Sequence, residues 1–273
     1  MEYEIKPAGK FSLNLKELWD FRELFYFFTW RDIKVKYKQT FLGFAWAILQ
    51  PAMMMLVFSF FIGNLLGENK NVDIPYPVFV YTGFIFWNIF ASGLQNAGNS
   101  MVTNANIIKK IYFPRLIIPM SSILVSIFDF LMTLVLYIPL LIYYKVNISL
   151  VGVLVCFPLA LTLTLITTLG AGTLLAALNV KYRDFRYVIP FMIQFLMFVT
   201  PVIYPVSIVS NKWLQFILQL NPMATAIDLA RGMFREEAVE PDMIFYGSMI
   251  SLLLLLTGIF YFRKTESYFA DLA

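Results

Sequence analysis

The sequence contains no histidine and only one cysteine, Cys156, which lies inside an apolar run. A single cysteine cannot form an intrachain disulfide, and without histidine it cannot complete a zinc site. The catalytic sets that join serine or cysteine to histidine are excluded by the same absence. We therefore expect no catalytic residue and no metal site of these kinds in the chain.

Charged residues are also scarce, at 14% of the chain, whereas 60% of the residues are hydrophobic. A soluble domain has about 25% charged and roughly 45–50% apolar residues. The formal net charge of +4 is modest, and no basic patch is interleaved with exposed aromatic residues. The composition therefore indicates an integral membrane protein that contacts lipids and does not bind nucleic acid.

A nucleotide-binding P-loop is missing as well. Its pattern requires a glycine, four residues, and then Gly-Lys-Ser/Thr. The only Gly-Lys pair, Gly9-Lys10, is followed by Phe11 and lacks the upstream glycine. The chain therefore has no recognisable cofactor site, and if it drives transport with ATP, a separate ATPase must bind the ATP and Mg²⁺.

Apolar runs dominate what is present. Six are close to or above the roughly 17–25 residues that a bilayer-spanning helix needs. They cover residues 41–66, 76–98, 116–144, 150–178, 188–204 and 243–262. We predict an all-α membrane protein with a cytoplasmic N-terminal segment at residues 1–40, a transmembrane domain at 41–263 and a tail at 264–273.

The N-terminal segment has the pattern of an amphipathic helix over residues 14–37. Its charged residues lie opposite a stripe of apolar residues at helical spacing, namely Leu15, Leu18, Trp19, Tyr26, Trp30, Ile33 and Tyr37. A helix with one charged face and one Trp/Leu face tends to lie in the headgroup region. Packing against a soluble partner is the alternative interpretation.

Positive charges predict the orientation of the chain. With the N-terminus inside, sixteen of the 21 Lys and Arg residues fall on the cytoplasmic side. Because cations flanking a hydrophobic segment resist translocation, both termini are expected in the cytoplasm. The cytoplasmic mouth of the membrane domain would carry Arg31, Lys34, Lys36, Tyr37 and Lys38.

Residues 206–242 contain two short apolar stretches, 213–220 and 223–234, that are separated by a turn at Asn221-Pro222. Neither stretch is long enough to cross a bilayer. We predict a short re-entrant or interfacial hairpin on the outer side, before the last span. A plain periplasmic loop with an amphipathic helix is the alternative.

Few ionisable residues are candidates for chemistry. Asp129 is the only one deep inside an apolar run, and no intramembrane Lys, Arg or His is available to pair with it. An intramembrane carboxylate can be a proton relay or a paired structural group. Asp32 and Asp184 each follow an arginine, so they are either Mg²⁺ ligands of a membrane enzyme or members of helix-end ion pairs.

Aromatic residues make up 18% of the chain and share faces on the second and fifth predicted spans. Flat apolar rings allow a sugar chain to slide without tight directional bonds, so these faces are candidates for a substrate conduit. Aromatics that face lipid or the interface are the alternative. The candidates are Phe79, Tyr81, Phe84, Phe86, Trp87, Phe90, Phe191, Phe195, Phe198 and Tyr204.

The loop at residues 99–114 is a candidate for contact with an ATPase. Thr103 or Asn104 can cap a short helix through Tyr112, which a proline then ends. A solvated loop has little reason to display three isoleucines, so an interface is expected; packing against the protein's own N-terminal helix is the alternative. The candidate coupling residues are Asn104, Ile107, Ile108, Lys109, Lys110, Ile111 and Tyr112.

An ordered set of motifs resembles the permease subunits of ABC exporters for polysaccharides. The motifs are 31–40, Leu42-Gly43, 45–51, Phe113-Pro114-Arg115, 179–184 and Asn221-Pro222, so the resemblance spans most of the chain. A basic stretch before an apolar helix is common among membrane proteins, and the long ordered match carries the resemblance.

The resemblance implies a homodimer of this chain in the bacterial inner membrane, paired with two ABC ATPase subunits. It also implies export of a lipid-pyrophosphate-linked polysaccharide, such as O-antigen in lipopolysaccharide biosynthesis. Two other functions stay open at this point. One is export of a small lipophilic compound, and the other is membrane-embedded synthesis of a lipid or glycan.

Overall fold

A computed structural model describes residues 15–38, 40–65, 67, 72, 74–209, 211–235 and 240–266, and no strand occurs among them. The predicted tail beyond residue 266 and the first 14 residues lie outside this description. The α-helices are α1 Leu15–Asp20, α2 Arg22–Tyr37, α3 Ala45–Phe58, α4 Tyr76–Thr103, α5 Ala105–Ile108, α6 Ile117–Tyr143, α7 Phe157–Lys181, α8 Phe185–Val199, α9 Lys212–Gln219, α10 Pro222–Arg231 and α11 Pro241–Thr265. Shorter helical pieces are the π-helical η1 Ser59–Leu65 and η3 Gly152–Cys156, and the 3₁₀ turns η4 Val206–Ile208 and η5 Gly232–Phe234.

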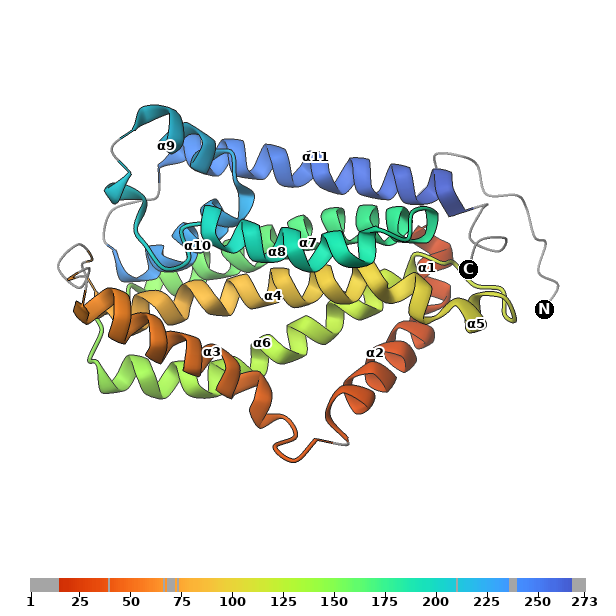
Figure 1. The fold of residues 1–273 in the computed structure, drawn as a ribbon, viewed down its shortest axis with the longest axis horizontal. Coiled ribbons are helices and arrows are strands. Elements are labelled where there is room, and N and C mark those ends of the chain that lie inside the picture. The colour runs from red at the N-terminus through yellow and green to blue at the C-terminus, as the bar shows by residue number, and fades with distance from the viewer. Residues whose placement is uncertain are drawn as a thin grey trace.

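Five helical segments of the described chain are long and apolar enough to cross a membrane, which confirms the all-α membrane fold. They are Ala45–Gly63, Tyr76–Thr103, Ile117–Tyr143, Gly152–Lys181 and Pro241–Thr265. Figure 1 shows α4, α7 and α11 running along the long axis of the molecule, with α2 and α3 meeting in a V beside α6. The end that carries α1 and α5 also carries the C-terminal end of α11, opposite α9 and α10 (Figure 1).

The fifth predicted span, 188–204, differs from the helix that forms. Helix α8 is a shorter apolar helix of 15 residues, and it ends at Val199. Pro201 restricts the residue before it to an extended conformation, and Thr200 accordingly has φ −82° and ψ 137°. At about 1.5 Å per residue, α8 covers about 22 Å, less than the roughly 30 Å hydrocarbon layer.

The N-terminal amphipathic helix forms, but it is divided at Phe21 into α1 and α2. Its predicted apolar stripe also splits between two environments. Leu18, Ile33 and Tyr37 are buried against the protein, whereas Trp19, Tyr26 and Trp30 are exposed. A helix in contact with both its own protein and its surroundings needs apolar residues on two sides, which spacing alone does not distinguish.

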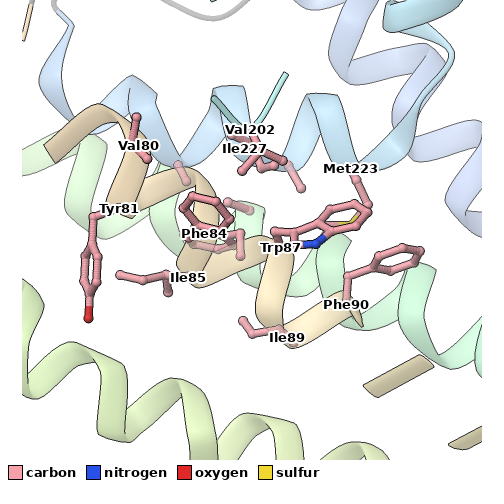
Figure 2. Packing of buried hydrophobic residues seen from close by; sticks show 14 of the residues in the cluster. Val80, Tyr81, Phe84, Ile85, Trp87, Ile89, Phe90, Val202, Met223 and Ile227 are labelled. Carbon is pink, nitrogen blue, oxygen red and sulfur yellow. The ribbon is translucent and has the colours of Figure 1, made fainter. Parts of the chain in front are cut away.

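Helix α4 is the centre of the main core. It packs against α6 and α7, and also against α3, α8 and α10. Figure 2 shows Tyr81, Phe84, Ile85, Trp87, Ile89 and Phe90 of α4 together with Val202, Met223 and Ile227. A second cluster, which includes Leu18, Phe28, Ile108 and Phe113, joins α1 and α2 to the loop after α4.

The predicted hairpin before the last span forms from α9 and α10. Asn221 is the N-cap of α10, and its side-chain oxygen accepts a hydrogen bond from the Met223 amide at 3.0 Å. Helix α10 is buried along most of its length because it packs among α4, α7 and α11, whereas α9 exposes Trp213 and Leu214. The burial of α10 among spanning helices favours the re-entrant arrangement over a plain surface loop.

Candidate functional site

A groove of about 500 Å³ lies between α3 and α8, with α4 at its base. We call it the α3–α8 groove. The end of α2 and the middle of α6 complete its lining with Lys36, Tyr37, Asp129 and Thr133. Trp46 contributes an aromatic ring from α3 and is 49% exposed.

Uncharged polar side chains recur along the groove. Asn88, Ser92 and Gln95 lie on one face of α4, at the i, i+4 and i+7 positions of a helix. Gln50 from α3 and Gln194 from α8 lie on the two flanks. This polar stripe was not singled out from the sequence, although its helical spacing inside an apolar run is a readable signal.

A polar cluster joins the end of α2 to α6. It consists of Lys36, Tyr37 and Asp129. The Lys36 ammonium donates to Asp129 Oδ2 at 2.5 Å, and the Tyr37 hydroxyl donates to Asp129 Oδ1. Burial, with the hydrogen bond and the charge of Asp129, raises the pKa of the Tyr37 phenol well above its usual range. The phenol therefore remains a hydrogen-bond donor.

This cluster corrects the expectation that Asp129 has no cationic partner. The ion-pair partner, Lys36, lies outside the apolar runs and 93 residues away in the sequence. The end of α2 brings it to the middle of α6 because α2 packs along that helix. Of the two interpretations considered for Asp129, the arrangement favours the paired structural group over a proton relay.

Arg231, the last residue of α10, is a buried cation that is only 3% exposed. Its guanidinium donates to the Pro201 carbonyl at 2.8 Å and the Val202 carbonyl at 2.6 Å. It also lies over the Phe79 ring, with Cζ 3.5 Å from the ring centroid. The end of α10 is thereby joined to the extended segment after α8.

Two more side chains hold the same extended segment. The Asn221 amide donates to Thr200 Oγ1 at 2.9 Å, and the Tyr76 hydroxyl donates to the Ile203 carbonyl at 2.6 Å. Together with Arg231, these side chains supply hydrogen bonds to polar groups that lie outside any helix and so lack the regular backbone partners. The irregular end of the short helix α8 is therefore tied to α4 and α10.

The predicted conduit aromatics divide into two groups. Those of α4 are at most 5% exposed and pack in the protein's own core: Phe79, Tyr81, Phe84, Phe86, Trp87 and Phe90. In this conformation their rings have little exposed surface, and of these six residues Trp87 belongs to the lining of the α3–α8 groove. Phe191, Phe195 and Phe198 of α8 are 57–70% exposed. Tyr204 is half-buried, and its hydroxyl donates to the Val199 carbonyl at 3.1 Å.

The predicted coupling helix is shorter than expected, because only Ala105–Ile108 is helical. Lys109 and Lys110 form a turn, and Ile111 and Tyr112 continue as irregular chain. Ile108 is 6% exposed and belongs to the cluster with Leu18 and Phe28, so this isoleucine packs against the N-terminal helices. Ile107 is half-buried. Ile111 and Tyr112 are 61% and 66% exposed, next to the exposed Lys109 and Lys110.

Asn104 has a different role from the expected side-chain cap. It is buried, makes no side-chain cap, and accepts a hydrogen bond from Arg31 at 2.7 Å. Arg31 also pairs with Asp32 at 2.7 Å, so for Asp32 the geometry is that of an ion pair. Of the other residues predicted at the mouth, Lys34 lies over the Trp30 ring, 5.2 Å from its centroid, and Lys38 is exposed.

Comparison with known proteins gives the class of this chain. Residues 23–234 match the family described as ABC-2 type transporter. The chain therefore belongs to the ABC-2 transporter family, as a membrane-spanning member.

Named relatives cover nearly the whole chain. An O-antigen export system permease protein RfbA of Klebsiella pneumoniae is 31% identical over 264 residues, 96% of this chain and 98% of the relative. The RfbA protein of Myxococcus xanthus is 28% identical over 257 residues, 92% of this chain and 96% of the relative. The polysialic acid transport protein KpsM of Escherichia coli is 24% identical over 245 residues, 86% of this chain and 91% of the relative.

Proposed function

We propose that this chain is the permease subunit of an ATP-driven exporter that moves a lipid-linked polysaccharide across the inner membrane. The observation that carries the proposal is the full-length similarity to permeases named for O-antigen export. The α3–α8 groove is compatible with a hydrophilic cargo, because uncharged polar side chains line it beside apolar ones such as Met54, Ile193 and Met197.

The proposed partners are a second copy of the chain and two ABC ATPase subunits. Helix α3 leaves most of its surface uncovered in one chain, with only 11% of its spanning window buried. We propose that a second copy covers part of that surface in a homodimer. Two ABC ATPase subunits would supply ATP hydrolysis from the cytoplasm, where both termini and the loop after α4 would lie.

The exposed aromatic face of α8 is the testable part of the conduit. Replacing Phe191, Phe195 and Phe198 together by alanine should lower polysaccharide export roughly tenfold. At about 0.5 kcal/mol for each ring contact, three rings amount to about 1.5 kcal/mol. The measurement is the amount of polymer on the surface of cells that rely on the variant as their only copy.

The matched control replaces Phe245 and Phe260 of α11, which are 65% and 48% exposed, by alanine. These residues should tolerate the change because they lie on another helix, outside the aromatic face of α8. Equal losses from both variants, at equal protein levels, would mean that the α8 rings are not part of a conduit. Unchanged surface polysaccharide in cells without the chain would contradict the proposed function itself.

Coupling to the ATPase is proposed for the exposed turn Lys109, Lys110, Ile111 and Tyr112. Ile111→Ala with Tyr112→Ala should weaken co-purification of the ATPase at least tenfold, since a buried interface anchor contributes about 2 kcal/mol or more. Lys109→Ala with Lys110→Ala should have a milder effect, because charges at an interface rim contribute less. The measurement is the ATPase retained by the tagged permease after washing.

An Ile-Tyr pair at the other end of the molecule serves as the control. Ile142 and Tyr143 are 71% and 79% exposed at the end of α6, and their replacement by alanine should leave the ATPase bound. If Ile111 and Tyr112 prove equally dispensable, the contact with the ATPase must lie elsewhere, and residues 181–186 at the end of α7 are the next candidate.

A further inference from the structure

The α3–α8 groove has the chemistry of a site for a neutral ligand. Among the residues that the structure describes, the only charged ones in its lining are Lys36 and Asp129, which pair with each other at 2.5 Å. Opposite charges held at that distance leave little net field for a free ion. Because Lys36 donates to Asp129, its charge is already balanced before a ligand enters the groove.

The amide side chains of the groove have hydrogen-bonding capacity to offer. Within the described chain, none of their amide groups hydrogen-bonds another residue: Gln50, Asn88, Gln95 and Gln194. A primary amide carries two donor hydrogens and an acceptor oxygen. Leaving these groups against lipid tails would cost roughly 1–3 kcal/mol each, so the groove must hold water or a polar ligand.

Sugar hydroxyls match this set of groups. Each hydroxyl both donates and accepts, and an amide can do the same from one planar group. Trp46 adds an exposed indole face at the edge of the groove, on which the apolar C–H side of a sugar ring can rest. A volume of about 500 Å³ is within the range of about 300–1,000 Å³ for small-ligand sites.

We infer that the α3–α8 groove binds an uncharged stretch of saccharide. The amides of Asn88 and Gln95 bind its hydroxyls, and Trp46 stacks on a ring. This inference rests on the proposed function and deepens it, because it assigns a neutral sugar to a site inside a single chain. It also assigns direct contact with the saccharide to the polar stripe of α4.

The test replaces Asn88 and Gln95 by leucine in the complete permease–ATPase complex. Leucine is close to these amides in size and is tolerated in a membrane helix, and no hydrogen bond from either amide is lost. The control is Asn96→Leu, on the same helix but outside the groove lining. The exchange Asn88→Gln with Gln95→Asn keeps both amides and should keep binding.

Binding is measured on complexes in phospholipid nanodiscs by saturation-transfer difference NMR. The probes are neutral oligosaccharides of glucose, galactose, mannose and N-acetylglucosamine, with oligosaccharides of sialic acid as the charged comparison. We expect at least one neutral probe to give a signal that Asn96→Leu retains and that the double leucine variant reduces at least fivefold. The sialic acid probe should give less signal than that neutral probe.

Three results would overturn the inference: no signal from any neutral probe, an equal signal from the double leucine variant, or a stronger signal from the sialic acid probe. Surface polysaccharide separates this failure from that of the proposed function. If loss of the chain abolishes the polymer while the double leucine variant exports normally, only the groove assignment is wrong. If loss of the chain leaves the polymer intact, the proposed function is wrong whatever the groove binds.

Discussion

Replacing Arg231 by methionine is expected to destabilise the protein by about 3 kcal/mol or more. The Pro201 and Val202 carbonyls each accept a short hydrogen bond from this guanidinium. Hydrogen bonds to a charged group contribute about 1.5–3 kcal/mol each, and a carbonyl left without a donor in a buried site loses that contribution. Methionine fills similar space over Phe79 but donates nothing, so the loss reflects hydrogen bonding more than packing.

The expected consequence is local as well as global. The segment after α8 should separate from α10, exposing residues 200–235 to protease before the rest of the protein unfolds. Thermal unfolding in detergent should show a decrease in Tm of at least about 5 °C. The Tm of Arg231→Lys should fall between that of the unmodified protein and that of Arg231→Met, because one ammonium cannot reproduce the forked geometry of a guanidinium.

Arg235 provides the matched control. It pairs with Asp228 at 3.1 Å on the surface, with 39% of its side chain exposed. An exposed ion pair contributes about 0–1 kcal/mol, so Arg235→Met should leave Tm and the protease pattern nearly unchanged. If Arg231→Met behaves like Arg235→Met, the guanidinium does not hold the segment after α8.

The second large effect is expected at Asp129. Asp129→Leu removes the acceptor of the buried Tyr37 hydroxyl and the counter-ion of Lys36. A buried donor without a partner costs about 1–3 kcal/mol. The end of α2 should therefore separate from α6, and amides of residues 33–38 should exchange with deuterium at least tenfold faster.

Milder substitutions distinguish the contribution of the Tyr37 hydrogen bond from that of the Lys36 ion pair. Asp129→Asn retains an acceptor for Tyr37 but loses the charge, so its effect on exchange should be smaller than that of leucine. Lys36→Met should also be mild, because 40% of the Lys36 side chain is exposed and solvent screens its charge. Faster exchange throughout α6 in Asp129→Leu, and not only at the end of α2, would mean general unfolding instead.

Several features of the fold could be predicted from local sequence because their physical cause is local. Apolar runs of sufficient length fix the spanning segments of α3, α4, α6, α7 and α11. Asn221-Pro222 marks the start of α10 because asparagine caps a helix and proline suits its first turn. The shorter α8 was also readable in principle, since Pro201 prevents the helix from continuing.

The aromatic and isoleucine assignments show the limit of periodicity. Spacing places Phe84 and Trp87 on a helix, but in a chain with apolar residues on every side it does not say which face meets protein. Ile108 and Ile111 are three residues apart, yet one packs beneath the N-terminal helices and the other is exposed. Burial depends on neighbours that are distant in sequence.

By itself, the sequence determined a helical membrane protein, the approximate limits of most spans and the helix that follows Asn221, because hydropathy, helix propensity and capping act over a few residues. Only the tertiary structure decided what the polar groups do. Lys36 reaches Asp129 across 93 residues, and Arg231 reaches Val202 across 29. A charged or polar side chain within an apolar fold is stabilised only by the partner that packing brings to it.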